Sequence, residues 1–256
     1  MEICDLTFSY NQQRTHLKEV SATIEVGKVT TIIGPNGSGK STLLSTMSGN
    51  LIPNSGQIII DGKSIQQFSA KEIAKKLAVV HQQNEAPADI TVEKLISYGR
   101  IPYKSFFKSN EGEDQTAIEW AIACTNLHDK RHSNLSQLSG GERQRVWIAM
   151  SLAQKTPILF LDEPTTYLDM YHQFEILELI QKLNKEHQMT VVMVLHDLNQ
   201  AIRYSDCLLV MKNGQLLLEG HPKTIINKEM IKEVYGVNVV VNEDQQTGLY
   251  MVPVGI

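Results

Sequence analysis

The sequence predicts an α/β fold with a mostly parallel sheet, a small antiparallel β subdomain and an inserted helical subdomain. Three short, largely apolar runs indicate the sheet, at 28–33, 158–161 and 190–195. Each run is continuous rather than alternating, which is typical of strands that are buried on both faces of a parallel sheet. Helical patterns lie between and after the runs, and strands that alternate with helices favour a doubly wound arrangement.

Each of the three runs stops at polar residues. The first ends at Gly34, the second at Asp162 and Glu163, and the third at His196 and Asp197. Ligands of doubly wound folds bind beyond the carboxyl ends of the strands. The three polar clusters therefore indicate a single ligand site at that edge of the sheet.

The middle of the chain has a different pattern. From about 91 to 154 it is mainly helical, and we expect loops around 99–112 and 129–138. A partly apolar helical face follows at 171–185, and the segment 56–61 is typical of a small antiparallel piece. We predict one domain over 1–256, divided as follows: an α/β core at 1–90 and 155–220, a helical subdomain at 91–154 and a tail at 221–256.

Composition excludes some classes of protein and leaves others open. A chain of 256 residues is long enough to bury roughly three quarters of its unfolded surface without disulfides or metals. The formal net charge of −4 argues against nucleic acid as the main partner, because phosphate binding usually needs a basic excess. Cys4, Cys124 and Cys207 lie far apart in the sequence, so we expect unpaired, buried thiols in a reducing compartment.

No segment is expected to cross a membrane. Acidic residues stand near the N-terminus, where a signal peptide needs basic ones. No apolar stretch approaches the length of about 20 residues that a spanning helix requires. If the protein serves a membrane, we expect it to do so from the cytoplasmic side through a partner.

A glycine-rich segment follows the first strand and fits the phosphate-loop pattern GxxxxGK[ST]. Its glycines let consecutive N–H groups point into one cavity, and the following helix directs its positive end at the same place. Lys40 adds a positive charge for the β- and γ-phosphates, and Ser41 offers a hydroxyl to Mg²⁺. The predicted phosphate-binding residues are Gly34, Pro35, Asn36, Gly37, Ser38, Gly39, Lys40, Ser41 and Thr42.

Two adjacent carboxylates follow the second strand. Side chains alternate along a strand, so the two have different roles. We expect Asp162 to hold Mg²⁺ and Glu163 to polarise the water that attacks the γ-phosphate. A solvated strand end is the alternative, and the phosphate loop argues against it.

The segment Leu138-Ser139-Gly140-Gly141-Glu142-Arg143-Gln144 opens a helix. Ser139 and Glu142 have the spacing of a capping box, and the two glycines leave N–H groups open for an anion. Taken alone, the segment is more typical of a capped helix with no ligand.

In its context, this segment resembles the signature motif of the ATP-binding cassette (ABC) family. The resemblance covers nearly the whole chain, and the motifs follow in the family's order: phosphate loop, glutamine loop, signature, aspartate–glutamate strand, D-loop and switch histidine. It implies the ABC type of the phosphate-loop NTPase fold, with ATP and Mg²⁺ as cofactors and ATP hydrolysis as the activity.

The resemblance also implies roles for single residues. Tyr10 is similar to the aromatic that stacks on adenine, although a core position stays open for it. Gln82 resembles the glutamine-loop residue that contacts Mg²⁺; its neighbour Gln83 is the alternative. Asp169 resembles the D-loop aspartate, and His196 the switch histidine at the γ-phosphate. The implied catalytic set is Glu163, His196, Gln82 and Lys40; the metal set is Ser41, Gln82 and Asp162; the further nucleotide contacts are Tyr10, Ser139, Gly140, Gly141, Glu142 and Asp169.

In this family two cassettes enclose two ATP molecules, each between the phosphate loop of one copy and the signature of the other. The resemblance therefore implies a homodimer bound to integral membrane permease subunits, and indirectly to a substrate-binding protein. It places the chain at the cytoplasmic face of a bacterial plasma membrane, without direct contact to cargo or nucleic acid.

Within the family, the chain is similar to the ATPases of iron-siderophore, haem and cobalamin importers. This rests on the segments Tyr98-Gly99-Arg100-Ile101-Pro102, Thr165-Thr166-Tyr167-Leu168-Asp169 with His172-Gln173, His196-Asp197-Leu198-Asn199, and the tail from Glu229 to Val237. Ferric siderophore import is the expected role, with haem or cobalamin import as the alternative. A cytosolic cassette acting on nucleic acid or ribosomes and an exporter cassette are the rivals. The first usually has two cassettes or a long coiled-coil insertion, the second is often fused to membrane helices, and this sequence shows neither feature.

Overall fold

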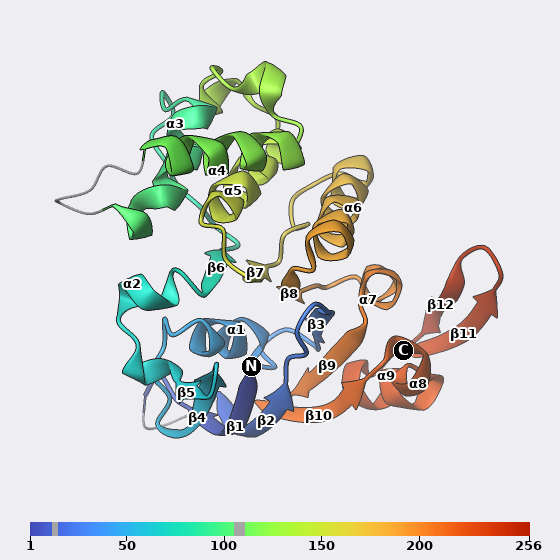
Figure 1. Cartoon of the computed structure of the whole chain (residues 1–256). Helices are drawn as coiled ribbons and strands as arrows, with labels where there is room; N and C mark the ends of the chain where they lie inside the picture. Colours follow the sequence, from blue (N-terminus) through green and yellow to red (C-terminus); the bar gives the residue numbers. More distant parts are fainter. Residues whose placement is uncertain (12–14, 105–110) are drawn as a thin grey trace. The chain divides into compact units, whose positions relative to one another are not determined.

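The computed structural model describes residues 1–11, 15–104 and 111–256. The chain forms two compact units. Unit 1 combines the two ends of the chain, Met1–Gln67 and Thr190–Ile256, and unit 2 is the continuous segment Phe68–Met189. Figure 1 shows the elements of both units in the order of the sequence.

Unit 1 contains the parallel strands that the first and third apolar runs predict. β3 (Val29–Ile33) pairs in parallel with β8 (Thr190–Val194) on one side and with β9 (Cys207–Lys212) on the other. Every residue of β3 and β8 is buried, as expected for strands covered on both faces. β10 (Gln215–Gly220) pairs antiparallel with β9 and gives the order β10-β9-β3-β8. The interpretation of these runs as buried strands is confirmed.

A second, antiparallel sheet in unit 1 has the order β2-β1-β4-β5. Its strands are β1 (Glu2–Phe8), β2 (Leu17–Thr23), β4 (Ser55–Ile60) and β5 (Lys63–Ser64). β1 and β2 alternate between buried and exposed residues, as a sheet with one wet face requires. The antiparallel piece predicted at 56–61 is the middle of this sheet.

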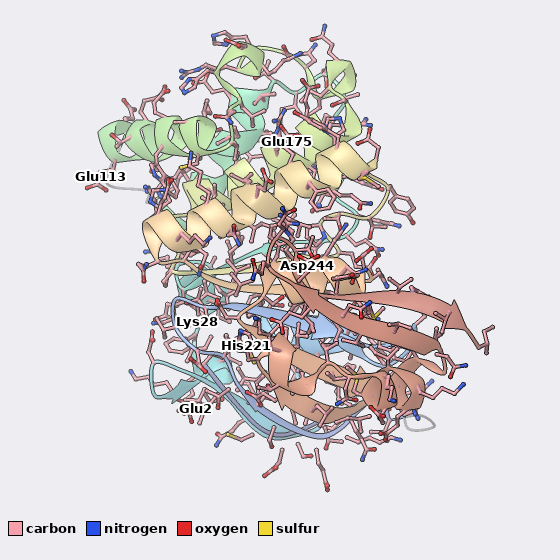
Figure 2. All side chains as sticks on the ribbon, turned by 90° about the vertical axis from the view of Figure 1, so that its right-hand side faces the viewer. Glu2, Lys28, Glu113, Glu175, His221 and Asp244 are labelled. Atoms are coloured by element: carbon pink, nitrogen blue, oxygen red, sulfur yellow. The ribbon has the colours of Figure 1, made fainter. Side chains whose placement is uncertain are left out.

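Short helices and a hairpin complete unit 1. The helices are α1 (Lys40–Met47), η1 (Ile65–Gln67), α7 (Leu198–Tyr204), α8 (Pro222–Ile225) and α9 (Lys228–Tyr235). The hairpin joins β11 (Asn238–Asp244) to β12 (Gly248–Gly255). Asp244, labelled in Figure 2, closes its turn by accepting the backbone N–H groups of Gln246 and Thr247, each at 2.7 Å.

Unit 2 consists of a parallel strand pair and a group of helices. β6 (Leu77–Val80) pairs in parallel with β7 (Ile158–Asp162), so the second apolar run is also a strand. The helices are α2 (Ala70–Ile73), α3 (Val92–Ser97), η2 (Tyr98–Tyr103), α4 (Glu111–Cys124), η3 (His128–Lys130), η4 (Leu135–Gln137), α5 (Gly140–Ala153) and α6 (Met170–His187). α3, α4 and α5 pack on one another, as Figure 1 shows in green.

Some expectations need correction. The loop predicted around 99–112 begins as the 3₁₀ helix η2, which continues directly from α3; residues 105–110 of that loop lie outside the described part of the chain. The three cysteines are free, but they are half-buried rather than buried. Among the described residues, the helices are all too short or too polar to cross a bilayer.

Candidate active site

The phosphate loop connects the end of β3 to the start of α1 in unit 1. Gly34 directly follows the strand, and a Cβ atom there would lie 2.1 Å from the carbonyl oxygen of Met211. Gly39 is the N-cap residue of α1 with φ of 104°, a conformation that favours glycine. These two positions explain why the loop needs glycine, and they direct the N-terminus of α1 toward its concave side.

Lys40 is folded back over this loop. Its side chain is nearly buried, and its Nζ donates to the carbonyl oxygens of Gly34, at 2.9 Å, and Pro35, at 3.1 Å. The loop's own carbonyls thus hold the ammonium group at the mouth of the loop. A positive charge placed there favours an anion such as a phosphate group.

The loop also contains a polar atom without a protein partner. Ser38 Oγ is buried and has no hydrogen-bond partner among the described residues. A buried hydroxyl without a partner costs free energy, which a bound anion would recover. A phosphate oxygen bound in the loop would accept a hydrogen bond from this hydroxyl.

A cavity of about 640 Å³ adjoins the loop. Gly37, Gly39 and Thr42 line one side of it. The other lining residues are Thr15, His16, Lys18, Asn213 and Gly214. The sequence analysis missed this second group, which comes from the start of β2 and from the turn between β9 and β10. The dipeptide Asn213-Gly214 does predict a hairpin turn, but nothing in its pattern indicates a ligand.

Backbone hydrogen bonds join this turn to the loop. Gly214 N donates to Ser38 O at 2.9 Å, and Lys18 N donates to Gly214 O at 2.8 Å. Gly39 and Gly214 both approach the backbone of His16 so closely that a side chain at either position would collide with its carbonyl oxygen. The wall opposite the phosphate loop is therefore fixed by main-chain contacts.

Tyr10 lies just after β1 and is 60% exposed. Its ring makes edge-to-face contacts with Phe8 and with His16, each with centroids 4.8 Å apart. The alternative of a core aromatic is wrong, because so exposed a ring adds little to a core. His16 lines the cavity, and the Tyr10 ring contacts His16, so the ring lies beside the cavity wall. This position is compatible with stacking on adenine.

We expect Tyr10→Ala to raise the Kd of ATP by about 5- to 150-fold, because one base–aromatic stacking contact contributes about 1–3 kcal/mol. Tyr10→Phe keeps the ring and serves as the matched control, with affinity close to that of the parent. A competition assay with a fluorescent nucleotide measures both variants. Equal affinity of the alanine and phenylalanine variants would remove Tyr10 from the adenine site.

His196 follows β8, and β8 is the parallel neighbour of β3. The register pairs Ile32 with Val194, so His196 and Gly34 leave the sheet at the same edge. Asp197 caps α7 by accepting the N–H of Gln200 at 2.8 Å, and His196 itself is exposed. Unit 1 thus brings His196 to the edge of the sheet that carries the phosphate loop.

Unit 2 joins the glutamine loop to the two carboxylates. β6 and β7 are parallel with Val80 opposite Leu161, so Gln82 and Glu163 follow neighbouring strand ends. Gln82 Nε2 donates to Glu163 Oε2 at 2.5 Å, and Thr166 Oγ1 donates to the same oxygen at 3.1 Å. Asp162 is the last residue of β7. Glu163 has a φ of 51°, in the left-handed region of the backbone that residues other than glycine rarely adopt.

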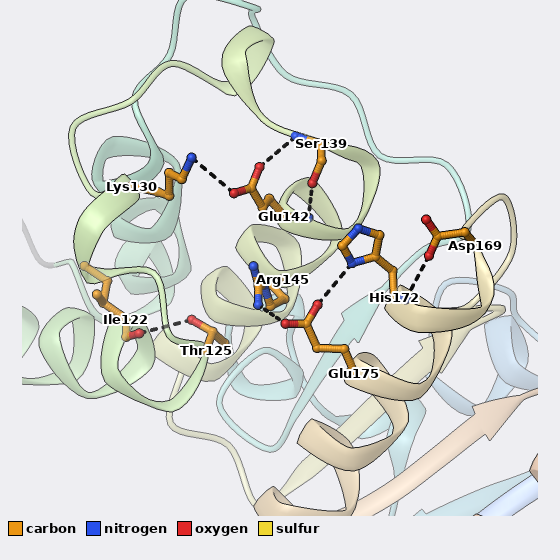
Figure 3. Close-up of polar contacts among 9 residues, drawn as sticks. All are labelled: Ile122, Thr125, Lys130, Ser139, Glu142, Arg145, Asp169, His172 and Glu175. Carbon is orange, nitrogen blue, oxygen red and sulfur yellow. Dashed lines mark hydrogen bonds and ion pairs between the residues drawn. The ribbon is translucent and has the colours of Figure 1, made fainter.

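The signature segment forms the expected capping box at the start of α5 (Figure 3). Glu142 N donates to Ser139 Oγ at 3.2 Å, and Ser139 N donates to Glu142 Oε2 at 2.8 Å. Lys130 Nζ lies 3.3 Å from the other oxygen of Glu142. Ser139 and Gly140 are exposed at the start of the helix, whereas Gly141 is buried.

These contacts lower the pKa of Glu142. The N–H of Ser139 contributes most, and Lys130 adds to it, while partial burial opposes the shift. A carboxylate with a lowered pKa stabilises the fold above its unfolded pKa, and this contribution is lost as the pH falls through the folded pKa. The start of α5 therefore becomes less stable in acid.

The D-loop residue Asp169 is the N-cap of α6. Its Oδ1 accepts the N–H of His172 at 3.0 Å, and Gln173 Nε2 donates to Leu168 O at 2.9 Å. Three large side chains around it are exposed: Tyr167, Met170 and Tyr171. The predicted site residues are thus grouped within the units. Unit 1 holds the phosphate loop, Tyr10 and His196; unit 2 holds Gln82, Asp162, Glu163, the signature and Asp169.

Comparison with known proteins agrees with these features. Residues 17–166 match the family described as ABC transporter. The petrobactin import ATP-binding protein FpuC of Bacillus anthracis is 46% identical over 232 residues, which cover 91% of this chain and 85% of FpuC. The iron(3+)-hydroxamate import ATP-binding protein FhuC of Bacillus subtilis is 44% identical, with coverages of 91% and 87%. The chain therefore belongs to the ABC transporter family, and it is an ATPase of that family.

A solved structure supports the predicted fold and the predicted binding of nucleotide. The dimeric structure of the bacterial ABC transporter cassette MJ0796 is similar with a TM-score of 0.75 and 30% identity, over 86% of this chain and 98% of the other. The same cassette is known in a post-hydrolysis state with ADP and Pi. The predicted α/β phosphate-loop NTPase fold and the binding of nucleotide by this chain are confirmed.

Proposed function

We propose that this chain is the ATP-hydrolysing subunit of an importer for ferric siderophores. The single observation that carries the proposal is the presence, on one chain, of a phosphate loop and a capped signature helix with an exposed start. Two relatives at 44–46% identity support this class of cargo, because they are named as the ATP-binding proteins of petrobactin import and of iron(3+)-hydroxamate import. Haem or cobalamin is the alternative cargo.

The proposed mechanism requires two copies of the chain. ATP lies on the phosphate loop of one copy, with Lys40 at the β- and γ-phosphates and Tyr10 against the adenine. Ser139 and the N–H groups of Gly140 and Gly141 of the other copy complete the pocket, because open N–H groups at a helix start stabilise the charge that develops on the γ-phosphate. Asp169 crosses between the copies.

Glu163 orients and deprotonates the attacking water, and His196 contacts the γ-phosphate. Thr166 and Gln82 both donate to Oε2 of Glu163, and these two hydrogen bonds orient the carboxylate. Ser41, Asp162 and Gln82 offer a hydroxyl, a carboxylate and an amide oxygen, and these hard oxygen ligands fit Mg²⁺. Gln82 uses its nitrogen for Glu163, so its amide oxygen suits the metal. Bound Mg²⁺ would neutralise charge on the β- and γ-phosphates.

The proposed direct partners are integral membrane permease subunits, whose import of cargo is energised by ATP hydrolysis on this chain. A substrate-binding protein, which delivers the cargo, is the indirect partner. The chain would then sit at the cytoplasmic face of a bacterial plasma membrane, attached through the permease. It touches neither cargo nor nucleic acid. The stretch 91–103, with α3 and η2, is the surface that we assign to the permease.

The test is a pull-down of this chain from its own membranes, followed by uptake assays with the co-purified permease in vesicles. We expect a ferric siderophore to be imported in an ATP-dependent manner, and expect haem and cobalamin to be left outside. Import of haem or cobalamin alone would replace the cargo assignment. ATPase activity that responds to nucleic acid or ribosomes but not to a permease would contradict the importer assignment as a whole.

A further inference from the structure

We propose that His172 is a positioning residue that joins the D-loop to the signature helix, so that Asp169 and the start of α5 are presented to the second copy as one rigid surface. The inference rests on the proposed function, because it concerns how half of the pocket is offered to a partner. All the contacts that carry it lie within unit 2, and Figure 3 shows the polar ones, which link His172 to Asp169 and, through Glu175, to Arg145.

The first contact is steric and explains a glycine of the signature. A Cβ atom on Gly141 would lie 2.6 Å from His172 Cγ and 2.7 Å from its Nδ1, which is closer than side chains approach. Gly141 is in α5 with an ordinary helical backbone, so its own conformation does not demand glycine. The side chain of His172 therefore packs against the main chain of α5 at this point. At Gly140, by contrast, a Cβ would meet Leu168 at an ordinary 3.5 Å.

The second contact is polar and reaches α5 one turn later. His172 Nδ1 lies 3.2 Å from Glu175 Oε2, and the other oxygen of Glu175 is ion-paired with Arg145 Nη1. Arg145 follows Gly141 by four residues, so both contacts fall on the same face of α5. His172, Glu175 and Arg145 are partly shielded from solvent, which strengthens the pair relative to a fully exposed one.

The third contact is the link to the D-loop. The main-chain N–H of His172 donates to Asp169 Oδ1 at 3.0 Å, and this bond fixes the carboxylate of the N-cap. A single residue therefore holds the D-loop aspartate through its backbone and the signature helix through its ring. A shift of about 1 Å in groups that stabilise a transition state lowers the rate by about 100-fold. The three contacts limit such a shift.

The test is a double-mutant cycle between Gly141 and His172. We expect Gly141→Ala to lower kcat by about 10- to 100-fold, because the added methyl group displaces the ring and with it the D-loop. We expect His172→Ala to lower kcat by a smaller factor, since it loosens the link without a clash. The double variant Gly141→Ala/His172→Ala should hydrolyse ATP faster than Gly141→Ala alone, because the collision is gone. If the loss of kcat in the double variant equals the product of the losses in the two single variants, the two residues act independently and the proposal is overturned.

Two further variants separate the ring from its hydrogen bond. His172→Phe keeps the ring over Gly141 and loses the contact with Glu175, whereas His172→Asn keeps a donor near the position of Nδ1 and loses the ring. We expect partial activity in both and more in each than in His172→Ala. In all His172 variants the Kd of ATP for the diluted, monomeric chain should stay within about twofold of the parent, since the phosphate loop is in unit 1. A loss of ATP affinity that parallels the loss of kcat would indicate general misfolding and would contradict a positioning role.

His132→Ala is the matched control, because this histidine of the same unit is 84% exposed and its Nδ1 lies 3.8 Å from Glu93 Oε2. Its kcat should equal that of the parent. ATPase activity measured over a dilution series of the parent chain distinguishes a failure of the two-copy mechanism from a failure of the role proposed for His172. Full activity of a monomer would remove the two-copy mechanism whatever the cycle shows, whereas concentration-dependent activity with multiplying effects would remove only the role of His172.

Discussion

Glu163→Gln is expected to bind ATP as the parent does and to hydrolyse it at least about 100-fold more slowly. A positioned general base contributes about 100- to 10,000-fold to a rate, and an amide cannot accept the proton of the attacking water. The amide has the shape of the carboxylate and can still accept the bonds that Gln82 and Thr166 donate to Glu163. The variant should therefore accumulate as an ATP-bound dimer, which size-exclusion chromatography and single-turnover kinetics measure.

Glu178→Gln is the matched control for this variant, because it makes the same chemical change at an exposed carboxylate on α6. Its turnover should be that of the parent. Unchanged steady-state turnover in Glu163→Gln would remove this residue from the role of base. A dimer that forms equally well without ATP would contradict the proposed order of binding and closure.

Lys40→Ala is expected to lose most of the affinity for ATP. The Lys40 ammonium group is the charged donor that the loop holds at its mouth through the carbonyls of Gly34 and Pro35. A hydrogen bond to a charged group contributes about 1.5–3 kcal/mol, so the Kd should rise about 10- to 150-fold, and further if both phosphates lose a contact. Isothermal titration calorimetry with ATP measures the change directly.

Lys28→Ala removes an equal charge from an exposed position of the same unit, labelled in Figure 2, and should leave the Kd unchanged. The Tm of both variants must be recorded, because Lys40→Ala leaves two loop carbonyls without their donor. Normal ATP binding by a folded Lys40→Ala variant would place the phosphates elsewhere.

The strands and the phosphate loop were predictable because their signals are local. A continuous apolar run that ends in a glycine pattern determines β3, the loop and the start of α1 with little tertiary information. The capping box of Ser139 and Glu142 is equally local, and the structure forms it as predicted. The roles assigned to these residues in binding and hydrolysis, and the division into domains, stay predictions.

The opposite wall of the cavity was not predictable, because it depends on which strands meet. His16 and Gly214 are about 200 residues apart in the sequence, and only the packing of β2 beside the turn of β9 and β10 brings them to the loop. The contact between His172 and Gly141 is of the same kind, since it depends on the packing of two helices. His172 and Gly141 each belong to a motif that the sequence shows, but the sequence does not indicate that the two residues are in contact. The 3₁₀ helix η2 was missed because its glycine and proline resemble a loop.

The backbone at Glu163 has a consequence for how this enzyme changes under selection. A left-handed conformation at a residue with a side chain costs about 1–2 kcal/mol, and glycine at this position would remove that cost. On the catalytic role proposed for Glu163, selection for heat resistance alone would therefore favour glycine here and abolish hydrolysis. Stability and turnover oppose each other at this single position, so a thermostable version of the enzyme must obtain its extra stability elsewhere in the chain.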